Sequence, residues 1–87
     1  MSMPDNGTWL IELATGKMYV VTVERIDDEC LWVSECSWVA DTGIRLGEFV
    51  KSGPQAASEI EKMVPGGFPR ALLCGFWRWP HVFPESQ

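Results

Sequence analysis

Apolar and polar side chains alternate along the first 40 residues in a pattern that predicts three β-strands. Residues 8–13 place three apolar side chains on one face. Residues 17–26 alternate over their whole length and are partly apolar on both faces, which indicates a central strand. Residues 29–39 return antiparallel after an Asp-Asp reversal, and their polar middle favours a bulge that re-aims Trp38.

After residue 39 the apolar side chains follow a helical spacing, which predicts a short helix over residues 43–51. Asp41 or Thr42 can cap its start, and Gly53 can end it. Residues 54–64 begin with proline and continue with good helix formers, so we expect a second short helix there, with a loop as the alternative.

The last third of the chain predicts one more strand and an aromatic tail. A Pro-Gly-Gly sequence at 65–67 ends whatever precedes it, and residues 68–76 form the expected strand. The tail over residues 76–84 carries enough aromatic side chains to pack back on the body or on a partner chain.

These elements together predict a mainly β fold of the α+β type. We expect four or five antiparallel strands in a small barrel or a strongly bent sheet, with one short helix after the third strand. The 87 residues make a single domain, 1–87. A core of this size supplies little stability, so we also expect a homo-oligomer.

Charge narrows the classes of partner. Twelve acidic and seven basic residues give a net charge of -5, which argues against a protein that binds nucleic acid through its phosphates. An acidic surface can instead meet a basic patch on another protein. No apolar run is long enough to span a membrane and no signal peptide is visible, so we expect a cytoplasmic protein.

Catalytic and metal chemistry have few candidate residues. His81 is the only histidine, and it lies between Pro80 and Val82 in the aromatic tail, so we do not expect a triad of nucleophile, base and acid. The three cysteines have no zinc-ligand spacing and are expected to be small buried apolar residues. We expect a protein that is not an enzyme and that uses no metal and no cofactor.

Aromatic and cationic side chains make the most informative combination. Indole rings can stack on a base, guanidinium groups can cover the base or hold a phosphate, and a turn before a helix can add backbone N–H donors. The candidate ligand-binding residues are Trp38, Asp41, Thr42, Gly43, Arg45, Trp77, Arg78, Trp79 and His81. Two plainer alternatives stay open, namely that Asp41 only caps the helix and that Trp77 to Trp79 alternate between core and solvent.

The strand, the Ser-Trp-Val-Ala-Asp-Thr-Gly corner at 37–43, the helix that ends at Gly53 and the Trp-Pro-His tail at 79–81 resemble small uncharacterised accessory proteins of bacteriophages and prophages. The resemblance implies a context more than a reaction. Small acidic phage proteins of this size often counter host defence, either by sequestering a nucleotide signal in an oligomer or by binding a host protein.

We therefore expect an anti-defence binding protein in the host cytoplasm. The first hypothesis is that it sequesters a small nucleotide-derived signal molecule, with Trp38, Arg45 and Arg78 among the residues of the pocket. The alternative is an inhibitor that binds a host defence protein through an acidic, tryptophan-rich surface, where Trp and Arg would dominate the binding energy. A structural or regulatory phage component without a ligand is the third possibility. A deep aromatic pocket would favour the ligand, and a flat aromatic patch would favour the protein partner.

Overall fold

The computed structural model describes residues 6–86, which form one antiparallel sheet with a short helix beside it. Four strands are ordered as β4-β3-β2-β1 and a fifth, β6, pairs with the other edge of β1, while β5 pairs with β3. The elements follow in the order β1 (Gly7–Leu13), β2 (Met18–Ile26), β3 (Cys30–Asp41), α1 (Leu46–Ser52), β4 (Glu59–Met63), β5 (Gly67–Pro69), the 3-10 helix η1 (Arg70–Leu72) and β6 (Leu73–Arg78).

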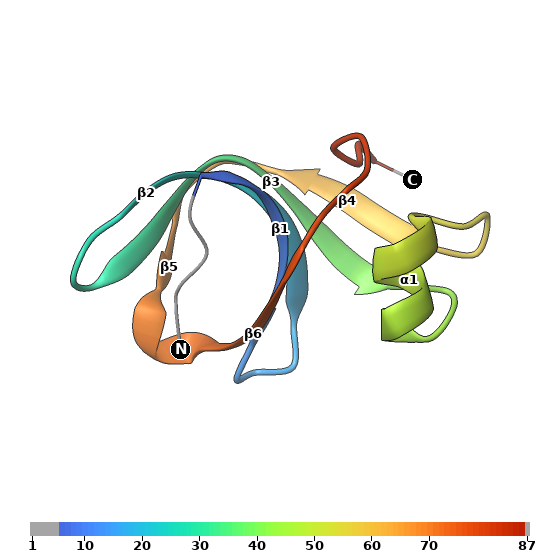
Figure 1. Ribbon diagram of the computed structural model, residues 1–87, viewed down its shortest axis with the longest axis horizontal. Helices are drawn as coiled ribbons and strands as arrows, with labels where there is room; N and C mark the ends of the chain where they lie inside the picture. Colours follow the sequence, from blue (N-terminus) through green and yellow to red (C-terminus); the bar gives the residue numbers. More distant parts are fainter. Residues whose placement is uncertain (1–5, 87) are drawn as a thin grey trace.

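The sheet is strongly bent and does not close into a barrel, as the mainly β prediction allowed. In Figure 1, β1, β2 and β3 arch across the view while β5 and η1 lie below them on the left. The register between β2 and β3 shifts where Thr22 pairs with Glu35 and Val23 pairs with Val33. That shift leaves Ser34 as the extra residue of a bulge, within the polar stretch where the sequence predicted one.

The bend gives the sheet two apolar cores, one on each face. The core inside the arch, here called the concave core, comprises the buried residues Ile11, Leu13, Val21, Val23, Leu31, Val33 and Cys36. The core on the opposite side, here called the helix core, comprises Leu10, Val20, Val39, Phe49, Ile60 and Trp79. Successive residues of a strand point to opposite faces, so β1, β2 and β3 each contribute to both cores. This explains the partly apolar character of both faces of the second predicted strand.

Helix α1 lies against the helix core and is shorter than predicted. It begins at Leu46, with Arg45 at the N-cap position and no side-chain cap hydrogen bond, so neither Asp41 nor Thr42 caps it. Phe49 is its fully buried side chain. The helix ends at Gly53, as predicted, where the Gly53 N–H donates to the Phe49 carbonyl at 2.8 Å.

Two predictions for the second half of the chain were wrong. Residues 54–64 do not form a helix, because residues 59–63 pair as β4 with the free edge of β3. The single strand expected over residues 68–76 is instead β5, then η1, then β6. The turn of η1 carries the chain from β3 to β1, so the last two strands lie on opposite sides of the arch.

Candidate functional site

The nine candidate ligand-binding residues do not come together in one pocket. Trp79 is 4% exposed and belongs to the helix core, where its ring lies 5.3 Å from that of Phe49. His81 packs edge-on against Trp79 at 4.9 Å, and its Nε2 is 2.9 Å from the Val50 carbonyl oxygen. Both side chains therefore hold the C-terminal tail against α1.

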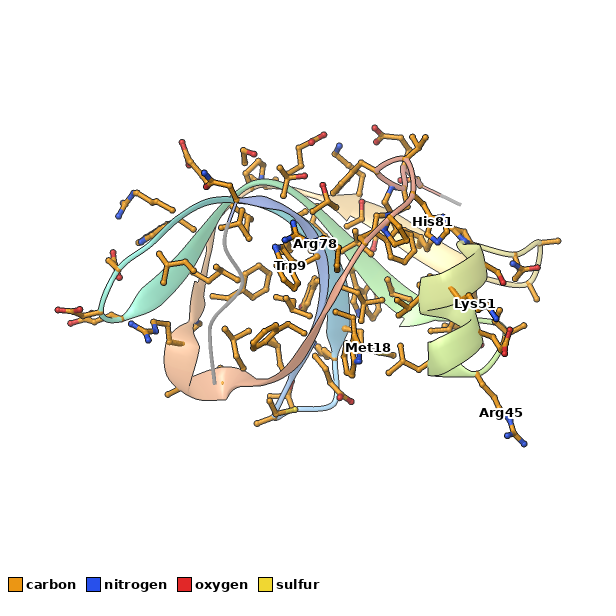
Figure 2. All side chains as sticks on the ribbon, in the orientation of Figure 1. Trp9, Met18, Arg45, Lys51, Arg78 and His81 are labelled. Atoms are coloured by element: carbon orange, nitrogen blue, oxygen red, sulfur yellow. The ribbon has the colours of Figure 1, made fainter. Side chains whose placement is uncertain are left out.

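Trp77 and Arg78 are neighbours on β6 but point to opposite faces of the sheet. The Arg78 guanidinium lies 4.3 Å from the centre of the Trp9 ring and donates to the Asn6 carbonyl. Trp77 is 37% exposed on the other face. Figure 2 shows Arg78 beside Trp9 in the middle of the molecule, whereas Arg45 projects from the far end of α1. The two arginines cannot hold one phosphate.

The polar groups of the Asp-Thr-Gly corner form hydrogen bonds within the protein. The Gly43 N–H donates to Asp41 Oδ1 at 2.8 Å, and the Thr42 hydroxyl donates to the Ile44 carbonyl. The Thr42 carbonyl in turn accepts from the buried Ser58 hydroxyl at 2.5 Å. These groups form a structural turn, and their donors are not directed at an anion.

Three surface hollows on the described part of the chain are candidates for ligand binding, and none of these three is lined by an arginine or a lysine. One of about 300 Å³ is lined by Asp27, Asp28, Glu29, Cys30 and Trp32. One of about 580 Å³ lies between the end of α1 and the tail, against Ser52, Gly53, Pro54, Pro80, His81, Val82, Phe83 and Pro84. The third, of about 170 Å³, is lined by Tyr19, Cys36, Met63, Val64, Gly66, Gly67 and Phe68.

Trp38 lies beside this third hollow. It pairs with Tyr19 on β2 and with Glu61 on β4, so the three side chains share one face of the sheet. The rings of Tyr19 and Phe68 lie 4.9 Å apart. By alternation along β4, Met63 and Glu59 share the face of Glu61. We name the surface made by Tyr19, Trp38, Glu59, Glu61 and Met63 the β3–β4 face.

Apolar side chains are exposed to solvent on this face and beside it. Trp38 is half-buried, Met63 is 40% exposed and Val64 is 86% exposed. The floor of the hollow is Cys36, which is 3% exposed and pairs with Met63. Burial raises the pKa of the Cys36 thiol to about 11, with Lys62 opposing the shift, so the thiol stays protonated and unreactive near neutral pH. The hollow offers apolar contact and no nucleophile.

Within the described chain, the carboxylates of the β3–β4 face have no ion-pair partner. Within residues 6–86, ion pairs join Arg25 to Asp27 and join Lys62 to Glu35 and Glu85. Neither Glu59 nor Glu61 takes part in them. In addition, Glu59 pairs directly with Asp41 across the strands, and like charges in such a pair destabilise a sheet. A cation brought from outside would relieve that repulsion.

The acidic run at 27–29 has a structural role. Asp27 accepts hydrogen bonds from the backbone N–H of Glu29 and Cys30 and from the Trp32 indole, at 2.8 to 2.9 Å. It also accepts from Arg25 at 3.1 Å. These bonds, first those to the Cys30 N–H and the Trp32 indole, hold the pKa of the Asp27 carboxyl well below its usual range. The carboxylate closes the turn between β2 and β3.

Sequence reasoning identified Trp38 but missed its neighbours Tyr19, Glu61 and Met63. The available signal was the alternation along each strand, but Glu61 and Met63 lie in the segment that was interpreted as a helix.

Among residues 6–86 no group of three metal-binding side chains comes together. In the same range no helix is long and apolar enough to cross a membrane. The prediction that the cysteines are buried is confirmed for Cys36, whereas Cys30 is only partly buried and Cys74 is exposed.

Comparison of the chain with protein-family models, with curated proteins and with solved structures found no match.

Proposed function

We propose that this protein is a binding protein without catalytic activity, which docks on a basic surface of a partner protein through its β3–β4 face. One observation carries the proposal. A half-buried tryptophan, Trp38, shares that face with the exposed Met63 and with two glutamates that no cation of the described chain neutralises. Aromatic anchors surrounded by a polar rim are typical of protein interfaces.

The same features weigh against the nucleotide hypothesis. A phosphate-binding pocket needs convergent cations or free N–H donors. The three hollows lack arginine and lysine, and the Gly43 N–H already donates to Asp41. A net charge of -5 adds a repulsive field for any polyphosphate.

The resemblance to phage accessory proteins supplies a candidate partner. In that setting the partner is a host defence protein, and the chain acts as its inhibitor by covering a basic functional surface. Such surfaces occur on proteins that handle nucleic acid. The expected oligomeric state stays a prediction that the mass of the purified protein in solution would test.

The test is capture from host lysate by the immobilised protein, followed by affinity measurement with the purified partner. Trp38→Ala is expected to weaken binding by about 30-fold, the effect of a residue worth about 2 kcal/mol at an interface. Trp77→Ala is the matched control, because Trp77 is 37% exposed on the opposite face of the sheet.

A panel of mono-, di- and cyclic nucleotides separates the two hypotheses. A ligand that binds only the folded protein raises its melting temperature. A raised melting temperature with one nucleotide, together with unchanged partner binding by Trp38→Ala, would contradict the proposal and restore the sequestering hypothesis.

A further inference from the structure

We infer that the β3–β4 face recognises an extended segment of the partner in which a lysine or arginine and an apolar side chain are separated by one residue. The inference rests on the proposed function and names the chemistry that the site selects. The cation would lie between Trp38 and Glu61, and the apolar side chain would enter the hollow above Cys36.

The position for the cation follows from the side chains around Trp38. Tyr19 and Glu61 pair with Trp38 from the two neighbouring strands, so an aromatic ring and a carboxylate flank the indole. A cation placed over an indole face gains cation–π attraction, which grows when water is excluded. Glu61 and Glu59 lie on the same face and have no cationic partner within residues 6–86, so a cation there also meets opposite charge.

Elsewhere the protein already uses the same pairing of an indole and a guanidinium. Arg78 covers Trp9 at 4.3 Å, and Arg25 covers Trp32 at 5.0 Å. In the second pair Asp27 completes the arrangement, because it accepts from both the Trp32 indole and Arg25. Trp38 and Glu61 reproduce the indole and the carboxylate, while no cation of residues 6–86 is found over the Trp38 ring.

The spacing follows from the strand geometry. Trp38 and Cys36 are two residues apart on β3, as are Glu61 and Met63 on β4, so the cation position and the hollow are separated by about 7 Å. An extended peptide places residues i and i+2 on one side at the same interval. A segment that lies along β3 therefore presents one side chain to each position.

The size of the hollow limits what enters it. Pockets for small molecules hold about 300 to 1,000 Å³, whereas this hollow holds about 170 Å³. Its lining is formed by Tyr19, Phe68, Met63 and Val64 together with the protonated Cys36 thiol. One aliphatic side chain suits this space and this chemistry better than a ring system that carries charge.

Synthetic peptides test the inference without knowledge of the natural partner. The probe is acetyl-Thr-Lys-Thr-Leu-Thr-amide, and the comparison peptide, acetyl-Thr-Thr-Lys-Leu-Thr-amide, has the same composition but adjacent lysine and leucine. Binding is followed by the NMR signal of the Trp38 indole, assigned from its loss in Trp38→Phe. We expect the probe to move this signal and to bind at least about tenfold more tightly than the comparison peptide.

A charge reversal provides the second arm. Glu61→Lys is expected to lose the lysine probe and to gain binding of a probe with glutamate in the same place. Glu24→Lys is the matched control, since Glu24 is exposed on β2 and the net charge changes equally. Equal affinity for both spacings, absence of binding by either peptide, or the same response in both charge variants would overturn the inference.

The outcomes also separate the inference from the proposed function. If Trp38→Ala loses a captured partner while the peptides fail to discriminate, the proposed function stands and the extended segment does not. If the peptides discriminate but the partner binds unaltered to Trp38→Ala, the face recognises the segment, and the physiological partner docks elsewhere.

Discussion

At the scale of single residues, the five tryptophans of this chain have different roles that their sequence neighbourhoods do not reveal. Trp9 and Trp32 are each half-buried and covered by an arginine. Trp79 looked like a ligand-binding residue and is buried. Alternation predicts which side chains share a face, but it does not predict which face α1 and the tail will cover. The role of each indole depends on whether α1 or the tail covers its face of the sheet.

The exposed carboxylate of Asp27 stabilises the turn between β2 and β3, and this contribution depends on pH. Because its pKa is lowered in the folded protein, its contribution to stability is complete above the unfolded pKa, about 3.9, and is lost as the pH falls below it. We predict that Asp27→Asn lowers the melting temperature at pH 7 and removes part of the loss that the wild type shows between pH 5 and pH 2. Thermal melting across this range measures both effects.

Asp28→Asn is the control, because it removes one negative charge from the same turn. The Asp28 side chain is exposed, and the hydrogen bonds that close the turn are accepted by Asp27. Equal acid sensitivity of the wild type and Asp27→Asn would show that other carboxylates dominate the acid response.

At the scale of elements, the first three strands and the end of the helix followed from the sequence because local pattern and tertiary context agreed. Residues 54–64 did not, because Ile60, Met63 and Val64 fit a helical spacing while β3 offered an unpaired edge. Pairing with that edge buries Ile60 to 4% exposure and brings Glu61 opposite Trp38. A neighbouring strand, absent from any local window of sequence, decided the outcome. The misassignment of β4 is also why the site was only partly predicted.

Helix α1 contains a glycine whose replacement by alanine should raise the stability of the protein. Gly47 is exposed, and a Cβ built on it would meet nothing within 4 Å. We predict that Gly47→Ala stabilises the protein by about 0.5 to 1 kcal/mol, since alanine loses less backbone entropy in a helix. This corresponds to a rise in melting temperature of roughly 2 to 8 °C for a domain of this size.

Gly16→Ala should have the opposite sign. Gly16 also has open space around it, but its φ of 90° in the turn between β1 and β2 is unfavourable for alanine. A loss of stability in both variants would mean that the start of α1 is held by contacts that alanine disturbs.

At the scale of the whole molecule, two cores share one sheet, and the tail completes one of them. The backbone N–H of Trp79 donates to the Thr8 carbonyl of β1 at 2.9 Å. The ring of Trp79 packs against Phe49 of α1. We predict that Trp79→Ala costs about 3 to 5 kcal/mol of unfolding free energy, as for other large core residues. Denaturant unfolding of the variant measures this loss.

Trp77→Ala supplies the comparison for Trp79→Ala, because it removes an equally large side chain that is 37% exposed. We expect its cost to be clearly smaller. Similar losses in the two variants would mean that the tail packs less firmly on the helix core than its contacts indicate.

The acidic character of the molecule predicts how binding depends on salt. If the partner is basic, its association rate should fall at least about tenfold between low and high ionic strength, since steering by opposite charges is screened. The double variant Glu59→Gln with Glu61→Gln should flatten that dependence while changing the dissociation rate less. Stopped-flow association measurements at several salt concentrations are suited to this test. A salt-independent rate in the wild type would argue against a basic partner.

The pairing of β1 with β6 has a consequence for how the protein folds during translation. Trp9 lies opposite Arg78, so the sheet beside the concave core joins the first and the last strand of the described residues. A ribosome must translate through Arg78 before β1 can pair fully with β6. The pairing of β1 with β6 should therefore form after the local pairing of β1 with β2, since contacts between distant segments of a chain form more slowly.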